Sequence, residues 1–79
     1  MNIEQELISY FRDITSEEVL CETQLIENRI IDSMGVLELL AFIDMKYDLN
    51  LDMEDLTIEN FATINNIKNL ILSKRRELE

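Results

Sequence analysis

The sequence predicts an all-α protein with four helical segments and a long loop after the first of them. Apolar residues recur at helical spacing in three stretches of the chain. Aspartate, serine and threonine residues, which commonly begin helices, stand just before the later segments. The chain has 79 residues, enough for one hydrophobic core. We therefore expect residues 1–79 to form a single domain without an enzyme cleft.

The first helix is expected over roughly residues 2–14, where apolar side chains fall on one helical face. From residue 15 to residue 32 this periodicity is lost and the apolar residues are scattered. This second stretch predicts a long loop that its apolar side chains hold against the core. The apolar residues are Ile3, Leu7, Tyr10 or Phe11, and Ile14 in the helix, and Leu25, Ile26, Ile30 and Ile31 in the loop.

A second helix is expected to begin at Asp32 and Ser33 and to end near Tyr47. Both side chains can accept hydrogen bonds from the unpaired N–H groups of a first helical turn. This helix carries one apolar stripe suited to the core and a second stripe on the side of its acids. The core stripe is Val36, Leu40, Ile43 and Tyr47 with Leu39 at its edge, and the second is Met34, Leu37, Ala41 and Met45, beside Glu38, Asp44 and Asp48.

We interpret the second stripe as a docking surface for partner proteins. A helix on the surface of a small helical domain can hardly bury two faces. Methionine and leucine side chains adapt to different partners, and carboxylates around them steer and orient those partners. The alternative is a central helix buried nearly all round. The expected docking residues are Met34, Leu37, Glu38, Ala41, Asp44 and Met45.

Two threonines mark the remaining helical segments. Thr57 can cap a short turn that runs through Phe61, and Thr63 can cap the last helix. Cations near the end of that helix complement the negative end of its dipole. Its apolar stripe is Ile64, Ile67, Leu70 and Ile71, and the cations are Lys74, Arg75 and Arg76.

The charge of the chain restricts its partners. Seventeen acidic and seven basic residues give a formal net charge of −10. This charge repels nucleic-acid phosphates and anionic lipid headgroups, so we expect binding to neither and favour proteins with basic patches. Acidity that serves solubility alone is the alternative. No membrane-spanning stretch or signal peptide is predicted.

The chain contains one cysteine, Cys21, and no histidine. The usual zinc ligand sets and an internal disulfide are therefore excluded, and we expect a protein of the reducing cytoplasm. Cys21 is expected to be a partly buried residue of the loop, because nothing near it in sequence would lower its pKa. Without histidine, Ser33 lacks the base of a catalytic triad, and we expect no enzymatic activity.

Ser33 stands where the loop meets the second helix, so its hydroxyl should be exposed at the positive end of the helix dipole. A phosphate ester would be well placed there. Taken alone, a serine in this position is more often only a helix cap.

The surrounding string changes this interpretation, because it resembles the phosphopantetheine-attachment motif of acyl and peptidyl carrier proteins. That motif centres on Asp-Ser-Leu at the start of the second helix. The resemblance covers almost the whole chain and includes the string before the last helix. The two strings are Ile30-Ile31-Asp32-Ser33-Met34-Gly35-Val36-Leu37-Glu38-Leu39-Leu40 and Glu59-Asn60-Phe61-Ala62-Thr63-Ile64.

The resemblance implies a right-handed four-helix carrier fold with a long first loop and a short third helix. It also implies a 4′-phosphopantetheine on Ser33, whose thiol holds an acyl or aminoacyl group as a thioester. The implied partners are a phosphopantetheinyl transferase, an acyl- or aminoacyl-loading ligase, and downstream transferases or synthases. These partners carry out the catalysis, and we expect the carrier to be a monomer. In the family's pattern Asp32, Met34, Leu37, Glu38 and Ala41 face partners.

Two departures from the family pattern bear on the cargo. Met34 replaces the common leucine, a conservative change in shape. Gly35 weakens the first helical turn by up to about 1 kcal/mol relative to alanine. The resulting Asp-Ser-Met-Gly form is similar to that of D-alanyl carrier proteins of teichoic acid modification and some other dedicated carriers. This similarity favours such a cargo over housekeeping fatty acid synthesis, while polyketide and nonribosomal peptide synthesis stay open.

An unrelated function is a calcium-binding loop. Asp48, Asn50, Asp52 and Glu59 match positions 1, 3, 5 and 12 of an EF-hand frame. Met53, however, replaces the glycine that the sharp turn needs, and no second hand is present. A third hypothesis is an acidic helical adaptor that carries no prosthetic group.

Overall fold

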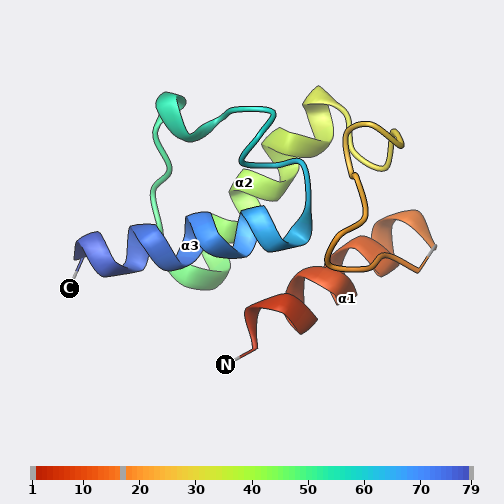
Figure 1. The fold of residues 1–79 in the computed structure, drawn as a ribbon. Coiled ribbons are helices and arrows are strands. Elements are labelled where there is room, and N and C mark those ends of the chain that lie inside the picture. Colours follow the sequence, from red (N-terminus) through yellow and green to blue (C-terminus); the bar gives the residue numbers. More distant parts are fainter. Residues whose placement is uncertain (1, 17, 79) are drawn as a thin grey trace.

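The computed structural model describes residues 2–16 and 18–78 and confirms an all-α fold. Within these residues there are three α-helices and one short 3-10 helix (Figure 1). The expected helix at residues 57–61 is present only as turns, so a count of four α-helices is not confirmed. The elements are α1 (Ile3–Thr15), α2 (Ser33–Tyr47), η1 (Met53–Asp55) and α3 (Ile64–Leu78).

Local hydrogen bonds define both ends of α1. The side chain of Asn2 accepts a hydrogen bond from the N–H of Gln5, at 3.1 Å, and so caps the first turn. The helix ends at Ser16, whose left-handed backbone (φ 60°) lets its N–H donate to the carbonyl of Arg12. These bonds satisfy backbone groups that a helix terminus otherwise leaves unpaired.

The buried face of α1 is shorter than its sequence pattern predicts. Ile3, Leu7 and Phe11 are buried, and Tyr10 is half-buried. Ile14 was expected on the same face, but its side chain is 49% exposed. The prediction for Ile14 is therefore wrong, because the last turn of α1 lies beside the loop and the start of α2 instead of on the core.

The hydrophobic core draws on the connecting segments as well as on the helices. Val19, Leu25 and Ile31 from the long loop are buried, as are Leu49 and Phe61 from the segment between α2 and α3. Fully burying one such side chain stabilises a fold by roughly 1.5–3 kcal/mol. The prediction that apolar residues hold the long loop against the core is confirmed.

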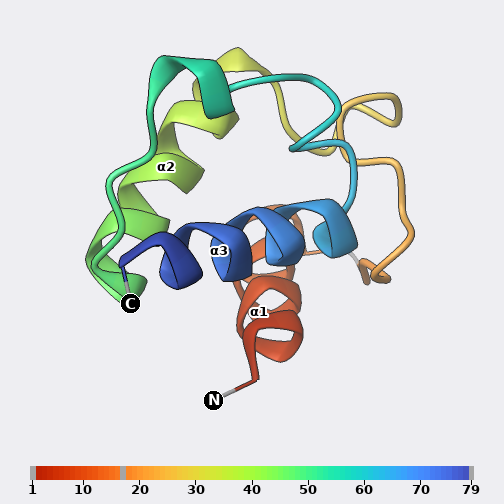
Figure 2. The same cartoon turned by 60° about the vertical axis from the view of Figure 1, so that its left-hand side comes forward.

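Backbone hydrogen bonds join the long loop to the residues that precede α3. The N–H of Leu25 donates to the carbonyl of Ala62 at 2.7 Å, and the N–H of Asn65 donates to the carbonyl of Cys21 at 3.1 Å. The carbonyl of Leu25 in turn accepts hydrogen bonds from the N–H groups of Ile30 and Ile31. Figures 1 and 2 both show these two distant parts of the chain side by side.

The segment between α2 and α3 is connected to α3 by an ion pair. The Nζ atom of Lys74 lies 3.1 Å from a carboxylate oxygen of Asp55 and 3.9 Å from one of Asp52. Asp52 and Asp55 also cap η1 reciprocally. Two acids within the EF-hand frame thus face an ammonium group, and the described residues contain no group of three or more His, Cys, Asp or Glu side chains that could hold a metal ion.

Both threonine caps are present. The hydroxyl of Thr57 accepts from the N–H of Asn60 at 3.0 Å, and that of Thr63 accepts from the N–H of Asn66 at 3.1 Å. The apolar stripe of α3 agrees with the prediction, because Ile64, Ile67 and Ile71 are buried and Leu70 is half-buried. The side chain of Arg76, one of the expected late cations, lies outside the described part of the chain.

None of the helices in the described part of the chain is both long enough and apolar enough to cross a membrane.

Candidate functional site

The start of α2 is organised by Asp32. Its backbone is extended, and its Oδ1 atom accepts a hydrogen bond from the N–H of Gly35 at 2.8 Å. Its carbonyl accepts the first helical bond, from Val36 at 2.9 Å. Asp32 is therefore the N-cap, and Ser33 is the first residue of the helix. The sequence left both residues open as caps, and the structure assigns that role to Asp32.

Ser33 has an exposed side chain in the first turn of α2. At this position the backbone N–H groups of the turn point out of the helix and the macrodipole is positive. An anionic group bonded to the hydroxyl would be stabilised there. Among the predicted site residues, Asp32 and Ser33 thus lie together at one helix terminus, where both are open to solvent.

Gly35 allows the helix to approach the long loop closely. A Cβ atom at this position would lie 3.2 Å from the Cβ of Ile31, which is buried in the core. The backbone of Gly35 has a negative φ, so no unusual conformation requires glycine here. Close packing against Ile31 is the physical reason for the residue.

The second apolar stripe of α2 is exposed. The exposed fractions are 64% for Met34, 54% for Leu37 and 87% for Met45, and Ala41 is also exposed. Glu38 and Asp44 are exposed on the same helix. The alternative of a helix buried nearly all round is therefore wrong. We call this set of six residues the Met-rich face.

The buried side of α2 differs from the prediction in its centre. Leu39, which was expected at the edge of the core stripe, is fully buried together with Ile43 and Tyr47. Val36 and Leu40, which were expected at the centre, are only half-buried. The helix is thus rotated slightly about its axis relative to the predicted orientation. The Met-rich face still points away from the core.

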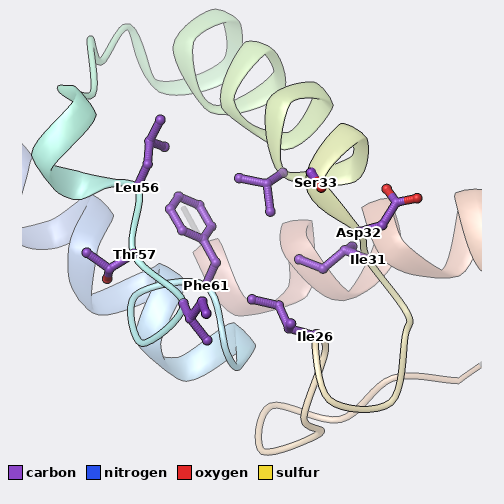
Figure 3. A pocket seen from close by; sticks show the side chains of 9 residues that line it. Ile26, Ile31, Asp32, Ser33, Leu56, Thr57 and Phe61 are labelled. Carbon is purple, nitrogen blue, oxygen red and sulfur yellow. The ribbon is translucent and has the colours of Figure 1, made fainter.

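An apolar cavity of about 360 Å³ lies beside Ser33, between α2 and the segment that follows η1 (Figure 3). Phe61 and Leu56 from that segment line it opposite Ile26 and Ile31 of the long loop. The carboxylate of Asp32 points away from it. Sequence reasoning missed this cavity, although the run of apolar residues between η1 and α3 was a signal, because short turns cannot bury such residues by themselves. Its lining is Ile26, Ile31, Asp32, Ser33, Val36, Leu56, Thr57, Ile58 and Phe61.

Cys21 is a half-buried free thiol next to α1. Its Sγ atom lies 3.6 Å from a carboxylate oxygen of Glu4, which also forms an ion pair with Lys68. Burial and the negative charge of Glu4 raise the pKa of Cys21. The Lys68 hydrogen bond lowers the pKa of Glu4. The thiol is therefore held in its protonated, poorly nucleophilic form, in agreement with the prediction.

Comparison with known proteins gives one relative along nearly the whole chain. The protein is 26% identical over 78 residues to aminoacyl carrier protein 2 of Bradyrhizobium diazoefficiens. The alignment covers 94% of this chain and 88% of that protein. No model of a known protein family matches the chain. The similarity supports a relationship to carrier proteins in general.

Proposed function

We propose that this protein is a carrier whose Ser33 bears a 4′-phosphopantetheine group in ester linkage. The observation that carries the proposal is the exposed Ser33 hydroxyl in the first turn of α2, in a chain related over 94% of its length to an aminoacyl carrier protein. The prosthetic group would supply a terminal thiol for a thioester. The polypeptide itself would be non-catalytic and would present the cargo to partner enzymes.

The residues around Ser33 fit such a group. The Asp32 cap fixes the first turn of α2, and this leaves the Ser33 hydroxyl accessible to an enzyme. The positive end of the helix dipole favours the negative charge of a phosphodiester at this position. The Gly35 N–H already bonds to Asp32, so the N–H groups of Ser33 and Met34 are the ones left to face the phosphate. Asp32 would therefore position the attachment site without contacting the reacting atoms.

We favour an amino acid as the cargo. The relative is named an aminoacyl carrier protein, and the Asp-Ser-Met-Gly string is similar to that of dedicated amino-acid carriers. A D-alanyl group for teichoic acid modification is one cargo of this class, and an acyl group is the alternative. The partners would be a phosphopantetheinyl transferase, a loading ligase and a downstream transferase, which would meet a monomeric carrier in the cytoplasm through the Met-rich face.

Intact-mass spectrometry tests the attachment directly. The purified protein is incubated with coenzyme A, magnesium and a broad-specificity phosphopantetheinyl transferase. The wild-type protein should gain the mass of one phosphopantetheine group, and Ser33→Ala should gain none. Ser9→Ala, which removes another exposed helical serine, is the matched control and should be modified like the wild type.

Two results would contradict the proposal. An unmodified wild-type protein would favour the acidic adaptor, and a modified Ser33→Ala variant would place the group elsewhere. After modification, a mass spectrum of protein isolated from its own host would identify the cargo.

A further inference from the structure

Ile14 exposes an apolar side chain that the core does not use. It lies in the last turn of α1 and is 49% exposed, whereas the other isoleucines of this helix, Ile3 and Ile8, are buried and half-buried. Ile14 borders a hollow of about 330 Å³ between α1, the long loop and α2. Met34 of the Met-rich face and Ile30 of the loop contribute further apolar surface to it. We call it the α1-side hollow.

The α1-side hollow adjoins Ser33. Two of its lining residues, Asp32 and Met34, are the immediate neighbours of Ser33 along the chain, and Gly35 follows Met34. The apolar cavity lies on the other side and includes Ser33 and Asp32 in its own lining. Ser33 thus stands between two hollows of different character. An enzyme that approaches the Ser33 hydroxyl from the side of α1 would therefore cover part of the α1-side hollow.

Charge distinguishes the two hollows. The lining of the apolar cavity contains a single charged residue, Asp32. The α1-side hollow combines apolar side chains with Arg29, Asp32 and Glu38, so its border is predominantly acidic. Such a border suits a partner surface in which an apolar side chain stands next to a lysine or arginine. The acidic border would not complement an uncharged hydrocarbon chain in the same way.

We propose that the phosphopantetheinyl transferase inserts an apolar side chain, with a basic residue beside it, into the α1-side hollow, so that its docking surface extends from α2 onto α1 at Ile14. The proposal rests on the proposed function of Ser33. It adds a contact outside the Met-rich face and assigns a partner to it. The contact positions the enzyme and takes no part in the chemistry.

Steady-state kinetics of the transferase provide the test, with the carrier as the varied substrate. Ile14→Ala should lower kcat/KM by about fivefold or more, mainly through a higher KM, because it removes the apolar contact and leaves Ser33 in place. Ile14→Gln, which keeps a side chain of similar bulk but not its apolar character, should do the same. Glu38→Gln should raise KM at low salt, and this difference should shrink at high salt.

Leu72→Ala is the matched control. Leu72 is an aliphatic residue of α3 with a similar exposed fraction, 41%, and it lies beside Asn2 and Glu4, at the opposite end of α1 from Ile14. The kcat/KM of the transferase for the Leu72→Ala carrier should stay within about twofold of the wild-type value. Urea unfolding of each variant verifies that the fold is intact.

The outcomes separate this inference from the proposed function. Wild-type protein that is never modified would disprove the function of Ser33. Modified wild-type protein with an unchanged KM for both Ile14 variants would disprove docking at α1 while the function stands. An equal loss for Leu72→Ala would also overturn the inference, because the effect would then not be specific to the α1-side hollow.

Discussion

At the scale of single residues, the start of α2 depends on one hydrogen bond. The Oδ1 atom of Asp32 accepts from the N–H of Gly35 at 2.8 Å, and this bond satisfies a backbone group that the helix itself leaves unpaired. The same residue lines both hollows that flank Ser33. The cap and the attachment site are therefore one structural unit.

Removal of this cap should be measurable as lost stability. Asp32→Ala should lower the free energy of unfolding by about 1 kcal/mol, because the N–H of Gly35 loses its partner. Asp32→Asn should keep nearly all the stability, since asparagine caps as well as aspartate does. Urea denaturation of both variants checks this. Equal losses for the two would show that the charge of Asp32 matters more than its hydrogen bond.

Individual contacts between distant residues could not be predicted from the sequence. The position of Ser33 at the start of a helix could be predicted, because the helix-start residues and the local string are adjacent in the chain. The phenol of Tyr47, in contrast, donates a hydrogen bond to Glu6, 41 positions earlier, and the Lys74 ion pair joins α3 to η1. The exposure of Ile14 likewise follows from where α1 ends relative to α2. Periodicity carries no information on such pairs.

At the scale of elements, α2 divides into a face that stabilises the fold and a face that is free for binding. Ile43 is fully buried on one side, while Met34 and Met45 are exposed on the other. Truncation on the two faces should therefore have opposite consequences.

Met34→Ala should change the free energy of unfolding by less than about 0.5 kcal/mol, because the side chain is mostly exposed. It should nevertheless slow modification by the transferase, and Glu38→Lys should do the same through repulsion of a basic partner. Ile43→Ala is the contrasting variant and should lose about 2–5 kcal/mol. Urea unfolding and the rate of mass gain measure the two effects. A large loss of stability in Met34→Ala would mean that the face contributes to the core.

The helix boundaries could be predicted well from the sequence because caps are local. Asp32 and Thr63 both cap the helices that they were expected to begin. The orientation of α2 was predicted less accurately, with Leu39 replacing Val36 at the centre of the buried side. The long loop and the segment with Phe61 also pack on this helix. The apolar periodicity of the helix alone does not show which of its residues these segments cover.

At the scale of the whole molecule, the start of α1 and the end of α2 are joined through Glu6. Its Oε2 atom accepts a hydrogen bond from the phenol of Tyr47 at 3.2 Å and lies 3.5 Å from the Nζ of Lys46. Burial, and then the charge of Glu6, raise the pKa of Tyr47 to about 12. Tyr10, which stacks on Phe42 with ring centroids 4.5 Å apart, also has a raised pKa, first through burial.

The raised pKa predicts alkaline destabilisation. The folded state binds the phenolic proton of Tyr47 more tightly than the unfolded state, whose pKa is about 10. The resulting stability is fully present below about pH 10 and is lost as the pH rises toward about 12. It amounts to at most roughly 2–3 kcal/mol. Tyr47→Phe should remove most of this pH dependence, whereas Tyr10→Phe should keep most of it.

Urea unfolding from about pH 8 to about pH 12 measures this difference. Tyr47→Phe should also be about 1 kcal/mol less stable near neutrality, because it loses the hydrogen bond to Glu6. If the free energy of unfolding fell equally with pH above about pH 10 in wild-type protein and in Tyr47→Phe, the assignment of the alkaline destabilisation to Tyr47 would be contradicted.

The bond between the Leu25 N–H and the Ala62 carbonyl also has a consequence for the order of events during synthesis. A growing chain cannot form this bond until residue 62 has emerged from the ribosome. The loop that carries Ile31 beneath Gly35 then lacks its distant anchor. On the proposed function, attachment of the prosthetic group to the anchored site would therefore follow the emergence of residue 62 from the ribosome.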